Sequence, residues 1–171
     1  MPVQDLAVVA SDLHLEDQSY ADRPVRGDSY FAWKQIVDDA LRRDVRHVLL
    51  LGDIVNRPNN PDGPIRELLA GLSDLDSSGV TTGYILGQHD GRCHWPRLTG
   101  EASPMHRRLT DVGGALVYGL DYQLAGSLQK ELDEIPASAD VLAAHQVWAD
   151  FMGDVAAPQG SFSDVPVVSV V

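Results

Sequence analysis

The sequence predicts a layered α/β fold. Short apolar runs, typical of strands buried on both faces, alternate with segments whose apolar residues recur at helical spacing. Several of these runs end directly in Asp, His or amide residues, which places polar groups at the carboxyl ends of strands. The length of 171 residues suits one domain, so residues 1–171 are expected to form a single domain.

The elements of the N-terminal half follow in order from apolar spacing. Leu6 to Ala10 form an uninterrupted apolar run and predict a buried strand. Apolar residues then recur at helical spacing from about Ser29 to Arg43, and Val48 to Leu51 predict a second strand. A helix around Ile65 to Leu72 leads into a third strand from Val80 to Leu86.

The C-terminal half is read in the same way. An irregular segment from Gly91 to about Glu101 precedes a short strand at Ala115 to Tyr118. A step of four between leucines predicts a helix from about Ala125 to Glu134. Val141 to Ala144 predict another buried strand, and the chain finishes with an apolar run from Val165 to Val171.

Composition narrows the possible partners. The formal net charge is −12, and an acidic chain repels nucleic acid unless a local basic face or a metal compensates. The single cysteine excludes an intrachain disulfide and fits a reducing compartment. We see no secretory signal and no apolar stretch near the roughly 20 residues of a membrane span, so we expect a soluble, cytoplasmic protein without membrane association.

Polar groups that can bind metal follow four of the strands. Each signal alone is weak, because an Asp after a strand is often a turn or cap residue and a lone His is often a core residue. Together they predict a metal site at one edge of the sheet, with ligands that suit manganese, iron or zinc better than calcium. The groups are Asp12 with His14, then Asp53, then Gln88, His89 and Asp90, and finally His145.

These motifs resemble those of the calcineurin-like metallophosphoesterases over nearly the whole chain. The segments in question are Asp12-Leu13-His14, Gly52-Asp53-Ile54-Val55-Asn56, Gly87-Gln88-His89-Asp90 and His145. Within that family the chain is most similar to the nuclease subunits of double-strand-break repair complexes, including phage-encoded ones. The resemblance implies hydrolysis of phosphate esters by water activated between two divalent ions, with manganese expected first and iron or zinc as alternatives.

The resemblance also implies a role for each matching residue. His89 would sit beside the scissile phosphate and protonate the leaving oxygen, Asp90 would orient His89 through a hydrogen bond, and Asn56 would support the site from outside. The metal ligands would be Asp12 and His14 for the first ion, Asp53 as the bridge, and Gln88 and His145 for the second ion.

Two departures from the family pattern affect these expectations. Gln88 stands where the family has Asn, and we predict that its longer amide still coordinates. The family's later Gly-His-x-His motif is not present, and the chain ends at Val171 within an apolar run. We therefore expect a C-terminally incomplete domain that lacks its last strands, or alternatively a degenerate domain with a partly built site.

Three functions remain open from the sequence. The leading one is a phosphodiesterase, in the first place a DNA exonuclease, that works with a partner ATPase subunit or as a homodimer. The alternatives are a small-molecule or phosphoprotein phosphoesterase, which suits the acidic surface, and a regulatory subunit without catalysis. The loop residue Trp95 is expected to anchor its segment rather than to stack on a base. The basic residues available to contact DNA are Arg42, Arg43, Arg46, Arg107 and Arg108.

Overall fold

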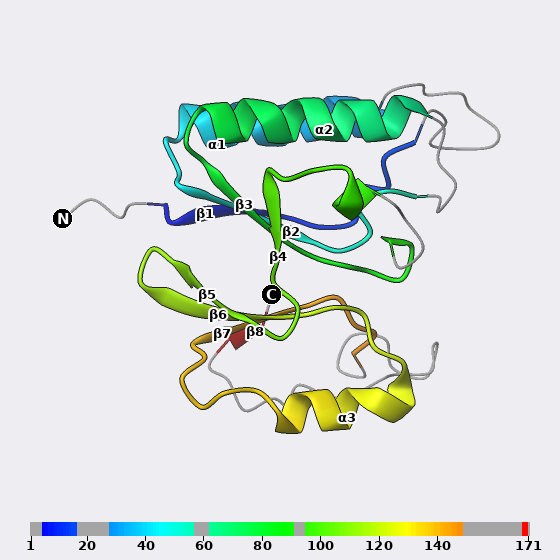
Figure 1. Ribbon diagram of the computed structural model, residues 1–171, viewed down its shortest axis with the longest axis vertical. Helices are drawn as coiled ribbons and strands as arrows, with labels where there is room; N and C mark the ends of the chain where they lie inside the picture. Colours follow the sequence, from blue (N-terminus) through cyan, green and yellow to red (C-terminus); the bar gives the residue numbers. More distant parts are fainter. Residues whose placement is uncertain (1–4, 17–27, 57–61, 91–94, 149–168, 171) are drawn as a thin grey trace.

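The chain folds into two β-sheets that pack face to face, with helices on the outer face of each (Figure 1). The computed structural model describes residues 5–16, 28–56, 62–90, 95–148 and 169–170. The four layers run helix, sheet, sheet, helix, and each boundary between layers holds its own apolar cluster. This arrangement confirms the layered α/β fold predicted from the sequence.

The first sheet consists of four parallel strands. In sheet order they are β1 (Ala7–Ala10), β2 (His47–Leu51), β3 (Thr81–Ile85) and β4 (Ala102–Pro104). Two helices, α1 (Asp28–Arg42) and α2 (Asp62–Ser77), cover the outer face of this sheet. Both helices bury one apolar stripe against the strands, as their periodicity requires.

The two helices of the first layer are joined by Trp33. Its indole Nε1 donates a hydrogen bond to the backbone carbonyl of Glu67, at 3.0 Å. A Cβ placed on Gly71 would lie 2.4 Å from the same indole nitrogen, so only glycine allows this close approach. The pair therefore fixes how closely α1 and α2 can pack over the sheet.

The second sheet combines a hairpin with two parallel strands. Its order is β5 (Leu109–Val112), β6 (Ala115–Leu120), β7 (Val141–Ala144) and β8 (Ser169–Val170), and only the β5–β6 pair is antiparallel. Helix α3 (Ala125–Asp133) covers the outer face through Leu128 and Leu132, which are fully buried. Between the two sheets lie Leu49, Leu51, Ile85, Met105, Val112, Val117 and Ala143.

Most predicted elements appear within one or two residues of their expected ends. The strands β4 and β5, which are three and four residues long, were not predicted. The predicted irregular stretch from Gly91 to about Glu101 holds a short 3-10 helix at Trp95–Arg97. Of the expected final strand, only Ser169 and Val170 lie within the described residues, and they pair with β7.

The parallel strands of both sheets run in the same sense, so their carboxyl ends meet at one rim of the molecule (Figure 1). The loops that follow β1, β2, β3 and β7 therefore come together there. No helix in the described part of the chain combines the length and apolar character needed to cross a bilayer.

Candidate metal centre

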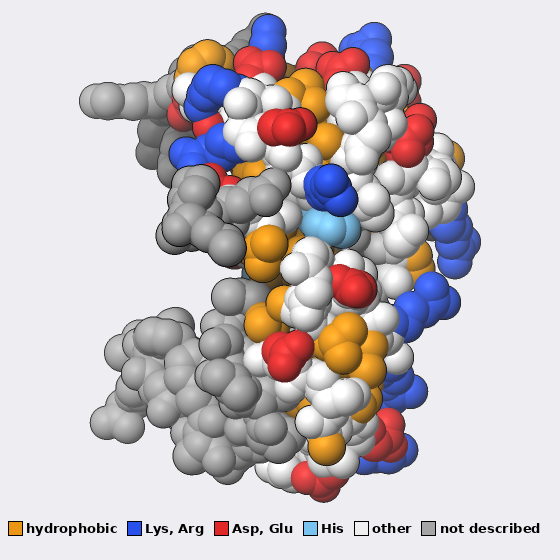
Figure 2. Space-filling view, turned by 90° about the vertical axis from the view of Figure 1, so that its left-hand side faces the viewer, with side chains coloured by type: hydrophobic (Ala, Val, Ile, Leu, Met, Phe, Trp, Pro, Cys, Tyr) orange, Lys and Arg blue, Asp and Glu red, His pale blue; other side chains and the backbone are white. Residues whose placement is uncertain are grey.

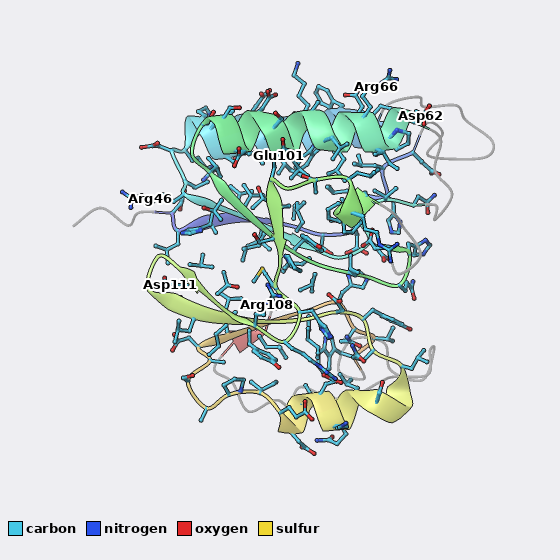
Figure 3. The ribbon with its side chains drawn as sticks, viewed as in Figure 1. Arg46, Asp62, Arg66, Glu101, Arg108 and Asp111 are labelled. Carbon is cyan, nitrogen blue, oxygen red and sulfur yellow. The ribbon has the colours of Figure 1, made fainter. Side chains whose placement is uncertain are left out.

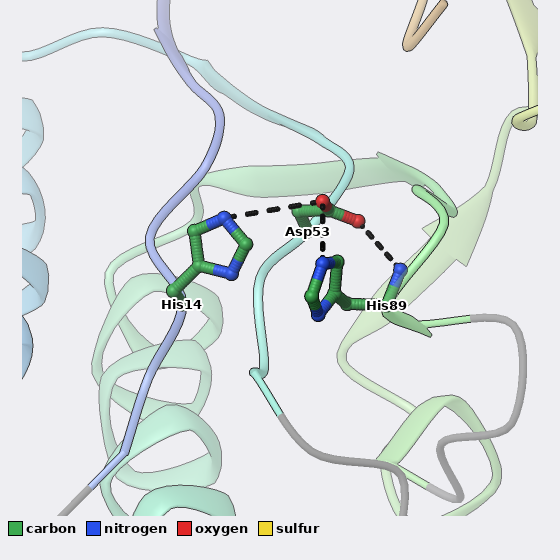
Figure 4. Close-up of side chains that lie close together, drawn as sticks. All are labelled: His14, Asp53 and His89. Carbon is green, nitrogen blue, oxygen red and sulfur yellow. Dashed lines mark hydrogen bonds and ion pairs between the residues drawn. The ribbon is translucent and has the colours of Figure 1, made fainter. Parts of the chain in front are cut away.

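Asp53 lies at the middle of the rim, just after β2, and its side chain is only 2% exposed. Its Oδ2 lies 3.4 Å from Nε2 of His145 and 3.9 Å from Nε2 of both His14 and His89. Its Oδ1 accepts a hydrogen bond from the backbone N–H of His89 at 2.8 Å. Figure 4 shows the rings of His14 and His89 next to this carboxylate, each joined to it by a dashed line.

Two sets of candidate ligands share the Asp53 carboxylate. One set is His14, Asp53 and His89, and the other is Asp12, Asp53 and His145; within each set the ligand atoms lie within 4.8 Å of one another. A carboxylate common to two sets is what a pair of cations needs as a bridge. In addition, Nδ1 of His14 is buried without a hydrogen-bond partner among the described residues. The residues present therefore fit divalent metal ions.

The backbone at these positions is strained. Asp12, His14 and Asp53 have φ angles of 54°, 45° and 51°, in the left-handed region that disfavours residues with a Cβ. The strained loops hold each other, because Asp12 N donates to Gly52 O at 3.1 Å and His14 N donates to Asp53 O at 2.9 Å. Strain of this kind, of order 1–3 kcal/mol for each residue, typically collects at functional sites.

Two glycines make room for the side chains of the centre. A Cβ on Gly87 would lie 2.1 Å from Oδ1 of Asp53, and a Cβ on Gly52 would lie 2.7 Å from the ring of His145. Gly52 also has a φ of 88°. The packing around Asp53 thus requires Gly52 of the Gly-Asp motif and Gly87 of the Gly-Gln-His-Asp motif.

His89 is oriented by a backbone carbonyl rather than by a carboxylate. Its Nδ1 lies 3.0 Å from the carbonyl oxygen of Asn56, which can only accept a hydrogen bond, so Nδ1 carries the proton. This leaves Nε2 facing Asp53, and the ring also packs edge-on against His14 with 4.9 Å between centroids. The side-chain amide of Asn56 donates instead to Glu16.

The expectation that Asp90 orients the ring of His89 is wrong. Asp90 is 1% exposed, and its carboxylate accepts the backbone N–H groups of Ile54, Val55 and Gly87 at 3.1–3.2 Å. It also lies 3.4 Å from Nε1 of Trp95, which is fully buried and anchors its segment as expected. Asp90 thus fastens the loop after β2 to the loop after β3, because a buried carboxylate requires several donors.

His145 reaches the centre from the second sheet. Its Nδ1 lies 3.0 Å from the carbonyl oxygen of Leu51 and donates to it, which turns Nε2 toward Asp53. Burial acts to lower the pKa of His145, but the hydrogen bond and charge of Asp53 outweigh it and the pKa is raised. For Asp53 burial acts to raise the pKa, and the contacts with His145 and His89 reverse this and lower it.

The amide of Gln88 does not join the cluster through any hydrogen bond of the described residues. Gln88 is exposed and lies in the turn between Gly87 and His89. The turn itself is held in place, because the neighbouring His89 donates its backbone N–H to Asp53. Coordination of a metal ion by Gln88 therefore stays a prediction.

An open cavity of about 670 Å³ adjoins the centre on the side of α1. Its lining includes Asp12, His14 and Asn56 from the rim and Phe31, Ala32 and Gln35 from α1. Two further carboxylates, those of Glu16 and Asp28, contribute to the wall, and none of the described lining residues is Lys or Arg. The space beside the centre is thus acidic and partly apolar.

The arginines expected to contact DNA lie away from this cavity. Arg42 and Arg43 lie at the end of α1 and pair with Asp39, and Arg107 pairs with Glu131. Arg46 precedes β2, at the amino ends of the strands and therefore at the rim opposite Asp53 (Figure 3). The face formed by that rim carries Lys and Arg side chains scattered among Asp and Glu (Figure 2). A continuous basic surface is not visible on it.

Comparison with known proteins gives the same classification as the site. The family model described as calcineurin-like phosphoesterase matches residues 7–160. The chain is 33% identical over 150 residues to the DNA double-strand break repair protein Mre11 of Haloferax volcanii, covering 82% of this chain and 34% of that protein. The chain thus spans about a third of the length of this curated relative.

Two solved structures are also similar. The protein TT1561 of Thermus thermophilus superposes with a TM-score of 0.55 at 15% identity, over 91% of this chain and 72% of the other, which supports the fold. A dimetal phosphatase from Danio rerio matches 49% of this chain and 29% of its own, with 26% identity and a TM-score of 0.38. The family match and the Mre11 similarity together decide the classification: the chain belongs to the calcineurin-like phosphoesterase family.

Proposed function

We propose that the chain is a metal-dependent phosphodiesterase that acts on DNA as an exonuclease, with two divalent ions, manganese foremost. The observation that carries the proposal is the buried Asp53 carboxylate shared by two sets of ligand atoms. The similarity to Mre11 supports a DNA substrate, and family membership supports phosphoester hydrolysis. Asp12, His14, Asp53, Gln88 and His145 would hold the ions, and His89, although it lies within reach of His14 and Asp53, would stay free for proton transfer.

Different residues of the rim would have different roles in such a reaction. Two bound ions would supply an activated water and neutralise charge on the phosphate. Nδ1 of His89 stays on the Asn56 carbonyl, so Nε2 is the nitrogen that can hold and release a proton toward a leaving oxygen. The His89 side chain is 38% exposed, which allows it to reach a bound substrate. Asp90 keeps this ring in place indirectly, through the backbone of both loops.

A second function, hydrolysis of a small phosphoester or a phosphoprotein, is favoured by the acidic cavity. Carboxylates of Asp12, Glu16 and Asp28 line it, and their negative charge repels a long phosphate backbone. Under the DNA proposal, a partner ATPase subunit or a second copy of the chain would supply the basic surface. A catalytically inactive role remains the third alternative, and it predicts that metal does not bind.

Manganese-dependent cleavage of labelled single- and double-stranded DNA tests the proposal. We expect His89→Ala to reduce cleavage by about 10²–10⁴-fold, the usual contribution of one acid–base group. His47→Ala is the matched control, because His47 lies at the opposite end of β2 and should leave cleavage unchanged. Hydrolysis of a generic aryl phosphodiester without DNA cleavage would favour the small-substrate alternative. No hydrolysis of either by the metal-loaded protein would overturn both.

The choice of metal is tested separately. Calorimetric titration with Mn²⁺, Fe²⁺ and Zn²⁺ in turn compares the affinity of the same site for each ion. Two Mn²⁺ ions per chain is the expected result, because mixed carboxylate, imidazole and amide ligands suit this ion. Absence of binding by all three ions would support the inactive alternative.

A further inference from the structure

The centre is built from two different sheets. Asp53 and His89 extend from the first sheet, whereas His145 follows β7 of the second. The apolar layer between the sheets is not directional, whereas hydrogen bonds restrain both the distance and the orientation of the groups that they join. Besides the contacts of His145 with Leu51 and Asp53, a second polar link joins the sheets at this rim.

The segment Asp121–Gln123, directly after β6, provides such a link to the first sheet. Oδ1 of Asp121 accepts the backbone N–H of Leu86 at 2.8 Å. The backbone N–H of Tyr122 donates to the carbonyl of the same Leu86, also at 2.8 Å. Both backbone groups of Leu86 are therefore held by the second sheet, one residue before Gly87 begins the Gly-Gln-His-Asp motif.

The same segment forms hydrogen bonds with Gln146, the residue after His145. Nε2 of Gln146 donates to the carbonyl of Asp121 at 3.0 Å, and Oε1 of Gln146 accepts the backbone N–H of Gln123 at 3.2 Å. One side-chain amide thus uses both its donor and its acceptor on this segment. The exits of β3, β6 and β7 are tied together, and these exits carry the two predicted ligands of the second ion, Gln88 and His145.

The backbone of Asp121 also forms hydrogen bonds with the side chains of His106 and Gln123. Its backbone N–H donates to Nδ1 of His106 at 3.1 Å, and Nε2 of Gln123 donates to its carbonyl at 3.1 Å. Its side chain is 24% exposed, so the hydrogen bond to Leu86 is largely shielded from water. A directional bond in a shielded setting positions a loop more strictly than an exposed one.

We infer that Asp121 and Gln146 are positioning residues that set the distance between Gln88 and His145 and thereby build the second metal site. The inference rests on the proposed function, because it concerns ligands that the proposal assigns. Asp121 and Gln146 lie outside all of the family-like motifs. They act on the backbones of the loops and not on the metal ions themselves.

The test compares Asp121→Ala, Asp121→Asn and Gln146→Ala with the unchanged chain. Calorimetry gives the number and affinity of Mn²⁺ ions, and amide hydrogen exchange of residues 86–89 without metal reports the loop directly. We expect Asp121→Ala and Gln146→Ala to weaken the second ion by about 10–100-fold, the range for residues that support ligands, and to leave the first ion unchanged. Asp121→Ala should also speed exchange at Leu86. Asp121→Asn should restore both, because its amide oxygen can accept the same N–H.

Asp140→Ala is the matched control. Asp140 also accepts a backbone N–H across the second sheet, that of Leu116 at 2.8 Å, but it does so at the amino end of β7. Its loss should leave both ions bound as in the unchanged chain.

The outcomes separate the inference from the proposed function. No metal binding by the unchanged chain would overturn the proposed function. Two ions bound normally by both Asp121→Ala and Gln146→Ala would overturn the inference and leave the proposed function standing. Equal weakening by Asp140→Ala would also overturn it, because the effect would then reflect general stability. If Asp121→Ala does not fold, Gln146→Ala decides.

Discussion

Oδ2 of Asp53 lies 3.4 Å from Nε2 of His145, and this contact joins the two sheets at the rim. The same carboxylate faces two further imidazoles, so its negative charge is the common element of the centre. Removing that charge while keeping the shape isolates its role.

We expect Asp53→Asn to keep the fold and to weaken Mn²⁺ binding by more than about 100-fold, beyond the effect typical of supporting residues. The amide oxygen can still accept the backbone N–H of His89, so the loops stay in place. Calorimetry measures the binding, and circular dichroism checks the fold. Binding of two ions with unchanged affinity would contradict the bridging role.

Gly87→Ala should disturb the packing around Asp53. The added Cβ would lie 2.1 Å from Oδ1 of Asp53, and relieving the overlap must move one of the two loops. We expect a loss of about 1–3 kcal/mol in the free energy of unfolding, as for overpacked sites, together with weaker Mn²⁺ binding. Gly100→Ala is the control, because nothing lies within 4 Å of its added Cβ. Urea denaturation of both variants makes the comparison, and equal stability would refute the packing argument.

Asp90→Ala should destabilise the fold more than a surface change does. Three buried backbone N–H groups would lose their acceptor, and each unsatisfied group costs about 1–3 kcal/mol. We therefore expect the free energy of unfolding to fall by about 3 kcal/mol or more, measured by chemical denaturation. Asp111→Ala removes a similar bond to Gly114 in an exposed turn and should cost less than about 1.5 kcal/mol. A small effect at Asp90 would show that water replaces its carboxylate.

Gln88→Ala tests whether the amide is a ligand. If Gln88 coordinates the second ion, its loss weakens that ion and spares the first, whereas Gln88→Asn retains an amide oxygen and keeps part of the affinity. Competition titration of the two Mn²⁺ ions distinguishes the sites. Identical affinities in all three proteins would remove Gln88 from the ligand set.

The ion pair between Glu131 on α3 and Arg107 predicts that the stability of the fold depends on pH. The hydrogen bond from Arg107 lowers the pKa of Glu131 against the opposing effect of burial. A carboxyl whose pKa is lowered by folding stabilises the fold above its unfolded pKa of about 4.3, and this contribution is lost as the pH falls through the folded value. The difference in unfolding free energy between the unchanged chain and Glu131→Gln should thus disappear in acid. Glu67→Gln, at an exposed position of α2, gives the reference.

Local patterns were sufficient for much of the fold. The strands β1, β2 and β7 have largely apolar sequences, and the three helices have regular apolar stripes. The prediction that β1 is buried was wrong, because β1 is the edge strand of its sheet and Val9 is 49% exposed. The strands β4 and β5 were missed because each is short and contains Pro or a charged residue. Pairing with the distant β3 makes β4 a strand, whereas β5 forms a hairpin with the adjacent β6 through Gly113 and Gly114. The division into two sheets depends on the same long-range pairing.

The candidate site also has features that the sequence predicts and features that it does not. The side chains that follow strands could be anticipated, because parallel strands deliver their ends to one rim. The roles of Asn56 and Asp90 could not, since one acts through its carbonyl and the other on backbone N–H groups. Such contacts depend on the exact path of the backbone, which residue identity alone does not report.

The left-handed conformations of Asp12, His14 and Asp53 bear on the history of the chain. At each of these positions glycine would adopt the same backbone conformation without the steric cost of a Cβ, yet the chain carries a candidate ligand side chain there. The three unfavourable residues therefore mark places where stability has been given up for some other advantage. Directed evolution for heat resistance alone, with no demand for activity, should change these positions early.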